Sequence, residues 1–411
     1  MPDPNKKPVA LVLGGTSPHA ELLRLLKNRG FWTILIDFYE NPPAKHAADD
    51  HLQESTLDKT KVLEIARKCN AALVISTCID QANVTACYAL ENLGKFSPYD
   101  YKTAVSVSNK IEMKSKMITG GIPTSKFIQV SEIDAADWSM LKFPLIVKPS
   151  DSNSSKGVRR CDTNEMVSRY LKEAIALSRT NQAVVEEFKE GREIAFDSYL
   201  LNGKVHILIT RERRKIIGFG DQIQQIYGSF WPANLSDEIE AKLIAVGEKI
   251  GTVFGLDNTP LMVQTIVHNN EVNVIEFAPR IGGGENYRII QMATGFNLID
   301  AAIDSFLDVK PVLNFHKTNR IFLDKYLYVS PSQFGKIQGL QELLEQKMIE
   351  CYDVYKSFGA VVTKEISSNN RVGSFIVSAD KQETGIDKIQ NVMGKIEVFD
   401  IKGDPILIKS I

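Results

Sequence analysis

In the first hundred residues, short runs of apolar side chains alternate with stretches in which apolar side chains recur every three to four positions. The runs predict strands, and the periodic stretches predict helices. The expected strands cover residues 9–13, 32–36 and 72–76, and the expected helices cover residues 20–26, 59–68 and 81–93. Strands and helices that alternate in this order form a parallel sheet covered by helices. We therefore expect an α/β domain over residues 1–105.

From about residue 106 the pattern becomes that of a mixed α+β structure. Helices are expected at 109–118, 164–178 and 237–254, and strands at 126–130, 145–148, 183–188, 194–201, 204–210, 261–267 and 272–277. The dipeptide Asn202-Gly203 predicts a tight hairpin turn. In the tail, strands expected at 360–366 and 374–378 alternate with short helices. This pattern predicts a second domain over 106–310 and a small α+β module over 311–411.

Composition and charge exclude several classes of protein. The 411 residues are 44% hydrophobic and 24% charged, with 49 Lys and Arg against 50 Asp and Glu, so a nucleic-acid partner is not expected. The five cysteines are scattered without a CxxC pair, which favours a reducing compartment. The apolar run near the N-terminus is too short for a signal peptide or a bilayer span. We expect a cytoplasmic protein without a membrane partner.

A glycine turn closes the first predicted strand. Gly14-Gly15-Thr16-Ser17 opens a helix, and backbone amides in that setting can receive an anion such as a substrate carboxylate. The alternative, that glycine is needed only for the conformation of a tight turn, is about equally supported. Because the G-x-G-x-x-G spacing is missing, only this turn and Asp37 favour a nicotinamide oxidoreductase.

The middle of the chain supplies the groups that a nucleoside triphosphate site needs. Lys110 opens a helix in SNKIEMK, and Lys148 ends an apolar strand before a polar loop at 149–157. Lysine acts on phosphate as a point charge. Acidic residues at the end of a strand in VVEEFKEGREI can accept hydrogen bonds from the adenine amino group and the ribose hydroxyls. Finally, Glu276 and Gln264 on adjacent strands can offer oxygen ligands to Mg²⁺. Each signal is weak alone, but their order is specific.

These motifs resemble the ATP-grasp superfamily, and within it the carboxylate–amine ligases related to carbamoyl-phosphate synthase and to dipeptide-forming amino acid ligases. The resemblance implies a Rossmann-like pre-ATP-grasp domain at 1–105, a two-lobed ATP-grasp domain at 106–310 with its mobile lobe at about 115–190, and a C-terminal extension. It also implies an ATP site and a magnesium (or manganese) site. The implied ATP contacts are Lys110, Lys148, Ser154, Ser155, Gly157, Glu186, Glu187, Phe188 and Glu193.

The metal motif departs from the family pattern in one residue. Gln264 and Glu276 match its metal ligands, while Arg280 matches the arginine that contacts the transferred phosphate, so Arg280 and Lys148 are the implied catalytic residues. Where many members read Glu-x-Asn-x-Arg, this chain has Ala278, so the third ligand is missing. The Ala-Pro-Arg form resembles the carboxyaminoimidazole ribonucleotide synthase branch. The phosphate loop also has Ser and Asn in place of most of the family's glycines.

The resemblance implies an ADP-forming ligase that phosphorylates a carboxylate and couples the acyl phosphate to an amine. Its partners would be a small carboxylate and a small amine, and a homodimer is possible. Substrate contacts are expected from Gly15, Thr16, Asp80 and Arg288. Arginines 211, 213 and 214 could also hold a substrate carboxylate, although surface ion pairs are slightly favoured for them. A bicarbonate-activating enzyme and a nucleotide-binding regulator without turnover remain alternatives.

Overall fold

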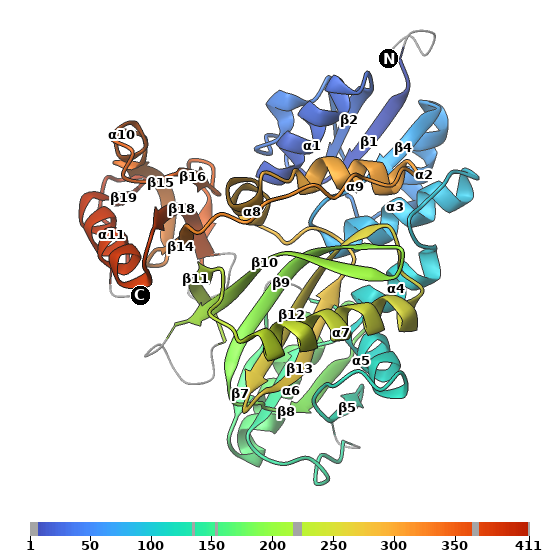
Figure 1. Cartoon of the computed structure of the whole chain (residues 1–411), viewed down its shortest axis with the longest axis vertical. Coiled ribbons are helices and arrows are strands. Elements are labelled where there is room, and N and C mark those ends of the chain that lie inside the picture. Colours follow the sequence, from blue (N-terminus) through green and yellow to red (C-terminus); the bar gives the residue numbers. More distant parts are fainter. Residues whose placement is uncertain (1–6, 134–135, 153–154, 217–223, 364–369, 410–411) are drawn as a thin grey trace.

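The computed structural model describes residues 7–133, 136–152, 155–216, 224–363 and 370–409. The chain forms an N-terminal α/β unit, a central unit with two sheets, and a C-terminal unit that lies beside the end of the larger sheet (Figure 1). The predicted α/β and α+β classes are confirmed. Among the helices within these ranges, none is long and apolar enough to cross a membrane.

The N-terminal unit is a parallel four-stranded sheet in the order β3-β2-β1-β4. Its strands are β1 (Val9–Leu13), β2 (Trp32–Asp37), β3 (Asp50–Gln53) and β4 (Ala71–Ile75), and its helices are α1 (Ser17–Asn28), η1 (Lys45–Ala47), α2 (Lys59–Lys68) and α3 (Asp80–Asn92). Strand β3 was not predicted because its DHLQ sequence lacks apolar alternation. A short polar strand is common at the exposed edge of a sheet.

The smaller central sheet is antiparallel and contains the strand with Lys148, which was predicted to contact phosphate. Its strands, in the order β5-β8-β6-β7, are β5 (Phe127–Val130), β8 (Ala183–Glu187), β6 (Leu145–Pro149) and β7 (Arg159–Cys161). Helix α6 (Asn164–Leu177) packs against it through Val167, Leu171 and Ala174. The helix predicted at 109–118 is α5 (Lys110–Thr119), and it follows an unpredicted helix, α4 (Tyr101–Ser108).

The larger sheet has eight strands and extends into the tail of the chain. Its order is β13-β12-β9-β10-β11-β14-β18-β16. The strands are β9 (Arg192–Leu201), β10 (Lys204–Lys215), β11 (Ile226–Trp231), β12 (Thr259–His268), β13 (Glu271–Ala278), β14 (Ile321–Tyr328), β16 (Cys351–Val354) and β18 (Arg371–Ala379), and helix α7 is Asp237–Phe254. The predicted hairpin at Asn202-Gly203 is confirmed, with φ of 54° and 71° at its two turn residues.

The tail is α+β, as predicted, but its strands are not all in a sheet of their own. Strands β14, β16 and β18 continue the large sheet, because β14 pairs with β11. A second sheet in the order β17-β15-β19 contains β15 (Ser332–Gln338), β17 (Val361–Val362) and β19 (Glu397–Asp400). Helix α11 (Gln382–Lys395) packs against β14 and β18, and α10 (Leu340–Glu345) contacts β16. The predicted strand at 360–366 is thus only two residues long, and most of the rest of it lies outside the described residues.

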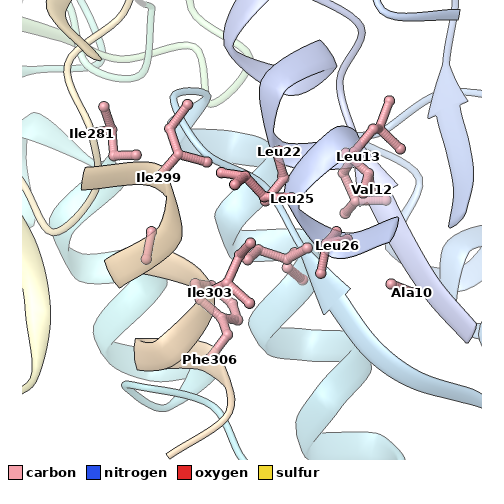
Figure 2. Close-up of a cluster of buried hydrophobic side chains, with 14 of the residues drawn as sticks. Ala10, Val12, Leu13, Leu22, Leu25, Leu26, Ile281, Ile299, Ile303 and Phe306 are labelled. Atoms are coloured by element: carbon pink, nitrogen blue, oxygen red, sulfur yellow. The ribbon is translucent and has the colours of Figure 1, made fainter. Parts of the chain in front are cut away.

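The chain returns from the large sheet to the N-terminal unit through α8 (Asn286–Thr294) and α9 (Leu298–Phe306). Figure 2 shows Ile299, Ile303 and Phe306 of α9 facing the leucines of α1, and all are part of one buried cluster. Burial of each such side chain stabilises the fold by about 1.5–3 kcal/mol. Arg29 adds ion pairs to Asp300 and Asp304 at 2.8 and 2.6 Å. This packing fixes the loop around residue 280 against the N-terminal sheet.

Candidate active site

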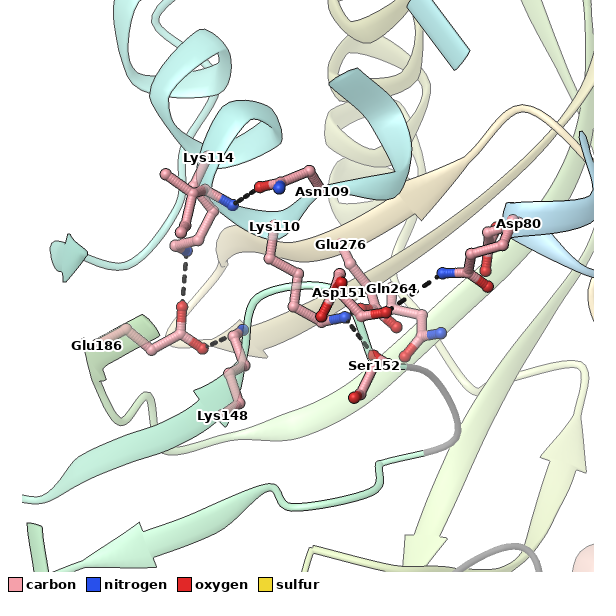
Figure 3. A network of polar contacts seen from close by, with 12 residues as sticks. Asp80, Asn109, Lys110, Lys114, Lys148, Asp151, Ser152, Glu186, Gln264 and Glu276 are labelled. Atoms are coloured by element: carbon pink, nitrogen blue, oxygen red, sulfur yellow. Dashed lines mark hydrogen bonds and ion pairs between the residues drawn. The ribbon is translucent and has the colours of Figure 1, made fainter. Parts of the chain in front are cut away.

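Two predicted lysines and a third, unpredicted one meet near the junction of the central sheets (Figure 3). On β6, Lys148 Nζ lies 2.5 Å from Glu186 Oε1, and on α5, Lys114 Nζ lies 2.8 Å from Glu186 Oε2. All three side chains are buried. Burial alone would raise the pKa of Glu186, but the two ammonium groups outweigh it and lower that pKa to about 2. Glu186 therefore carries a negative charge that holds both lysines in place.

Lys110 connects the phosphate loop with the metal hairpin. Asn109 caps α5 by accepting hydrogen bonds from the amides of Ile111 and Glu112, which places Lys110 in the first turn of the helix. Its ammonium donates to the Ser152 carbonyl at 2.7 Å and lies 3.8 Å from Glu276 Oε2. A single cation thus contacts both segments between which a triphosphate would lie.

The cross-strand register brings the predicted metal and ribose residues onto one face of the large sheet. Glu276 on β13 is directly opposite Gln264 on β12, so their side chains lie on the same side. On β9, Glu193 pairs with Arg213 at 2.6 Å and with Lys215 at 3.3 Å. Arg213 also donates to Gln264 Oε1, so its guanidinium bridges the two predicted sites. Burial opposes ionisation of Glu193, but the cations prevail and lower its pKa.

The predicted catalytic arginine is held by the N-terminal unit. Arg280 makes a bidentate ion pair with Asp80, with Nε–Oδ1 and Nη2–Oδ2 distances of 2.8 and 2.9 Å. Asp80 begins α3 just beyond the carboxyl end of β4, and the Ile281 amide donates to the Thr77 carbonyl in the same segment. Burial alone would lower the pKa of Arg280, but the Asp80 carboxylate outweighs burial and raises that pKa above its usual value. The guanidinium therefore stays charged.

Comparison with known proteins supports the resemblance to the ATP-grasp superfamily. Residues 141–287 match the family model described as ATP-grasp domain. The chain contains an ATP-grasp domain. It is 26% identical to a formate-dependent phosphoribosylglycinamide formyltransferase from Ignicoccus hospitalis over 256 residues, which are 60% of this chain and 62% of that protein. It is 25% identical to an L-arginine-specific L-amino acid ligase from Bacillus subtilis over 289 residues, which are 66% and 69% of the two chains.

A solved structure extends the similarity to the whole fold. The L-amino acid ligase from Bacillus licheniformis superposes with a TM-score of 0.80 at 18% sequence identity, covering 96% of this chain and 99% of the other. This likeness includes the N-terminal and C-terminal units that flank the ATP-grasp domain. The fold implied by the resemblance is thereby confirmed, and the match over residues 141–287 supports its ATP-grasp assignment.

Within the ATP-grasp domain, the residues predicted to contact adenine are arranged differently from expectation. The Glu186 carboxylate is occupied by two lysines, so it does not present an open acceptor to an adenine amino group. The Glu187 carboxylate accepts a hydrogen bond from the Lys142 amide at 3.3 Å, and the Phe188 amide donates to the Pro144 carbonyl at 2.9 Å.

The predicted phosphate loop of the ATP-grasp domain is only partly described. Ser154 lies outside the described residues. Ser155 has a φ of 55°, and its carbonyl accepts a hydrogen bond from Gln225. Gly157 has a φ of 70°, and a Cβ there would lie 2.7 Å from Leu177 and 3.0 Å from Pro149. Glycine is therefore required at 157 for backbone conformation and packing.

The turn at Gly15 and Thr16 is occupied by internal contacts. A Cβ on Gly15 would lie 2.4 Å from Pro42 and 2.9 Å from Asp37, so no side chain fits there. The Thr16 hydroxyl is 2.8 Å from Nδ1 of the buried His19, whose pKa burial lowers to about 3. A neutral histidine thus orders the turn. These contacts favour a tight turn over a substrate contact as the reason for the glycine.

Arg288 lies away from the phosphate lysines and anchors the C-terminal unit. It donates to the Tyr352 carbonyl at 3.1 Å and to Asp353 at 3.2 Å, both on β16. Ser17 on α1 donates to the same carboxylate, so Asp353 joins α8, β16 and the N-terminal unit. Arg288 contributes to the junction of three units.

Two charged residues of the site, Lys114 and Lys215, were not predicted, and Arg213 was named only as a possible contact to a substrate carboxylate. Lys114 follows Lys110 by one helical turn, and that i,i+4 spacing was the available signal. Arg211, Arg213 and Lys215 occupy every second position of β10, so their side chains lie on one face of the strand. Surface ion pairs were slightly favoured for Arg211, Arg213 and Arg214. This prediction is wrong for Arg211, which is buried and pairs with Asp197 at 2.9 Å.

The metal motif offers one open carboxylate. Glu276 is 33% exposed and its nearest cation is Lys110. The oxygen of Gln264 accepts from Arg213, and Ala278 lies opposite Met262, which is apolar. Among the described residues no group of three or more His, Cys, Asp or Glu could hold a metal ion. Because Mg²⁺ is often bound by one or two carboxylates together with substrate phosphates and water, Glu276 fits a magnesium ion that arrives with a nucleotide.

The lysine–glutamate cluster leads to a stability prediction. Replacing Glu186 with Gln leaves two buried lysines without a carboxylate, so the free energy of unfolding should fall by about 3–5 kcal/mol. In the wild type, the pKa of Glu186 is depressed to about 2, so its contribution is complete above about pH 4.5 and is lost as the pH falls toward 2. Urea unfolding at pH 7 and pH 3 measures both effects.

A matched control for that experiment is Glu173→Gln. Glu173 pairs with Arg159 at 2.9 Å and its side chain is 33% exposed, so its replacement should lower the free energy of unfolding by about 1 kcal/mol or less. The difference in stability between wild type and Glu186→Gln should shrink at pH 3. Equal free energies of unfolding for the two variants at pH 7 would show that the cluster of Lys114, Lys148 and Glu186 does not stabilise the fold more than a surface ion pair does.

Proposed function

We propose that the protein is an ATP-dependent ligase that phosphorylates a carboxylate and couples the acyl phosphate to an amine, with release of ADP and phosphate. The observation that carries this proposal is the convergence of Lys110, Lys148 and Glu276 between the two sheets of the ATP-grasp domain. Lys110 contacts the Ser152 carbonyl in the phosphate loop and approaches Glu276 at 3.8 Å. Such an arrangement supplies cations for phosphate oxygens beside a carboxylate for magnesium.

The nucleotide would lie between the small and large sheets. Lys110 and Lys148 provide positive charge for its phosphates, and Glu193, charged and held by Arg213, provides an acceptor for ribose hydroxyls. Glu276 would hold Mg²⁺, or Mn²⁺, against phosphate oxygens, and the ion neutralises charge on the transferred group. The ATP and magnesium assignments of these residues are inferences from their placement and from the family resemblance.

The reaction needs positioning and charge compensation rather than a nucleophilic side chain. A carboxylate oxygen of the acid attacks the γ-phosphorus of ATP, and ADP leaves with the bonding electrons. The amine nitrogen then attacks the acyl carbon, the C–O bond to phosphate breaks, and inorganic phosphate leaves. Arg280, fixed by Asp80, would stabilise negative charge during transfer, and the part-buried, preformed ion pair costs little reorganisation.

A second candidate rests on the sequence of the metal strand. Ala278-Pro279-Arg280 resembles the carboxyaminoimidazole ribonucleotide synthase branch, whose acid would be bicarbonate. In that case the phosphorylated species would be carboxyphosphate. The missing third ligand at Ala278 also suits a nucleotide-binding regulator without turnover, which would bind ATP and release no phosphate.

A phosphate-release screen distinguishes these functions. Purified protein is incubated with ATP and Mg²⁺ together with amino acids, other small carboxylates or bicarbonate, each alone and paired with amines. We expect phosphate release that depends on an organic acid and rises further with an amine. Release that depends on bicarbonate alone supports the second candidate. ATP binding without release under any condition supports the regulator. The expected homodimer and cytoplasmic location stay predictions.

A further inference from the structure

Lys114 is a fully buried cation beside the predicted ATP site. Its side chain is 1% exposed, and its ammonium donates to the Thr124 hydroxyl at 2.7 Å and pairs with Glu186 at 2.8 Å. The Thr124 hydroxyl in turn donates to the Val274 carbonyl on β13 at 2.8 Å, which fixes the place of the lysine against the metal strand. Burial of an ammonium is unfavourable unless it is paired and hydrogen-bonded, so a lysine at this position is costly to keep.

The register of the small sheet explains why Lys148 meets the same carboxylate. Glu186 on β8 is directly opposite Ile146 on β6, and Lys148 follows Ile146 by two positions, so all three side chains lie on one face of the sheet. Figure 3 shows Lys114 reaching Glu186 from α5 while Lys148 approaches it from β6. Each ammonium has its own carboxylate oxygen, Oε2 for Lys114 and Oε1 for Lys148.

The cluster of these two lysines and Glu186 has more positive than negative charge. Within the described ranges, Glu186 is the one carboxylate with an oxygen within 4.0 Å of either ammonium. Its pKa of about 2 keeps it ionised at neutral pH. Burial lowers the pKa of Lys114, and the Glu186 carboxylate opposes that shift. One carboxylate therefore faces two ammonium groups, and one positive charge of the cluster is not compensated.

Lys114 changes what an approaching phosphate would meet at Lys148. Without Lys114, both oxygens of Glu186 could hold Lys148, and the two side chains would form a neutral buried pair. A phosphate would then have to draw the ammonium away from its carboxylate, and separation of a buried ion pair is costly. With Lys114 in place, Glu186 stays paired when the Lys148 ammonium turns toward a phosphate.

We propose that Lys114 is a positioning residue for the nucleotide: it neutralises Glu186 and thereby leaves the positive charge of Lys148 available to the phosphates. The proposal rests on the proposed ATP-dependent function and adds a residue to that site. A purely structural role, in which Lys114 only attaches α5 to β8, predicts a different response when Glu186 is neutralised as well. In that case the second substitution removes a further contact and restores nothing.

The test restores the charge balance without restoring Lys114. Lys114→Met removes the ammonium and keeps a long side chain, whereas the double variant Lys114→Met/Glu186→Gln removes one charge of each sign and so returns the cluster to its wild-type net charge. Lys114→Arg keeps the positive charge. The control is Lys116→Met, which removes an ammonium that lies on the same helix, 4.8 Å from the centre of the Phe254 ring. Calorimetry measures binding of a non-hydrolysable ATP analogue with Mg²⁺, and circular dichroism shows which variants are folded.

We expect Lys114→Met to weaken binding of the analogue by about 10- to 100-fold, and the double variant to bind within about threefold of wild type. Lys116→Met should bind as wild type does, and Lys114→Arg should lie between wild type and Lys114→Met. Unchanged affinity in folded Lys114→Met, or a double variant that binds no better than Lys114→Met, overturns the assignment. If Lys114→Met does not fold, the double variant decides: wild-type affinity supports the role of Lys114, and a loss of about 10-fold or more overturns it.

The same measurements separate this role from the ligase function. Wild type that binds the analogue but releases no phosphate from ATP with any acid counts against ligation alone, because the binding comparison still reports on Lys114. Wild type that does not bind the analogue overturns the ATP site and the role of Lys114 together.

Discussion

Glu276→Gln should abolish magnesium-dependent turnover, with a loss of at least about 1,000-fold in kcat. Of the three positions of the metal motif, only 276 offers an open carboxylate, because the oxygen of Gln264 is engaged by Arg213 and position 278 is alanine. A neutral amide has the same shape but lacks the charge that Mg²⁺ requires in order to bridge phosphate oxygens. The rate is measured as phosphate release at several magnesium concentrations, and excess magnesium should rescue little of it.

Glu271→Gln is the matched control for this variant. Glu271 starts the same strand, is exposed, and lies opposite His268 at the other end of the hairpin, so its removal should leave turnover within about twofold. Both variants should unfold at the wild-type temperature, since neither removes a buried ion pair. Wild-type turnover in Glu276→Gln would mean that the metal lies elsewhere.

Lys148→Ala should weaken ATP binding by about 10- to 100-fold and reduce turnover by a larger factor. The loss of one hydrogen bond to a charged group corresponds to about 1.5–3 kcal/mol in binding, and the same contact is stronger when charge moves during transfer. Lys148 is buried and pairs with Glu186 at 2.5 Å, so its ammonium is desolvated and held in place. Calorimetry with ATP or a non-hydrolysable analogue measures the binding change.

The control for Lys148→Ala is Lys142→Ala. Lys142 is exposed near the start of the same strand, and its side chain makes no ion pair within 4.0 Å among the described residues. Lys142→Ala should bind ATP as wild type does. If Lys148→Ala also bound ATP with unchanged affinity, while remaining folded by circular dichroism, Lys148 would have only a structural role beside Glu186.

Local patterns in the sequence were enough to find the chemical groups of the site. Lys110 begins a predicted helix, Lys148, Gln264 and Glu276 lie in predicted strands, and the structure places all four around one junction (Figure 3). The Asn202-Gly203 turn likewise depends on two adjacent residues. Predictions of this kind succeed because strand alternation and helix capping are decided by neighbouring side chains.

The partners of those groups could not be predicted, because they come from distant segments. Arg280 and Asp80 are 200 residues apart, and no local rule connects the start of α3 with the loop after β13. Glu186 was predicted to contact adenine, but its carboxylate pairs with Lys114 on α5 and with Lys148 on β6. The continuation of the large sheet into β14 and β18 depends on the same long-range packing.

Trapping of an acyl phosphate tests the proposed ligation most directly. An acyl phosphate is a mixed anhydride, so hydroxylamine added with ATP, Mg²⁺ and the acid found by phosphate release should yield ADP, phosphate and a hydroxamate in equal amounts. Arg280→Ala, which removes the guanidinium held by Asp80, should lose all three products. Lys249→Ala, which removes an exposed ammonium bound to the Gly121 carbonyl, should retain them. A stable phosphate ester, or ATP hydrolysis without hydroxamate at any hydroxylamine concentration, would contradict activation of a carboxylate.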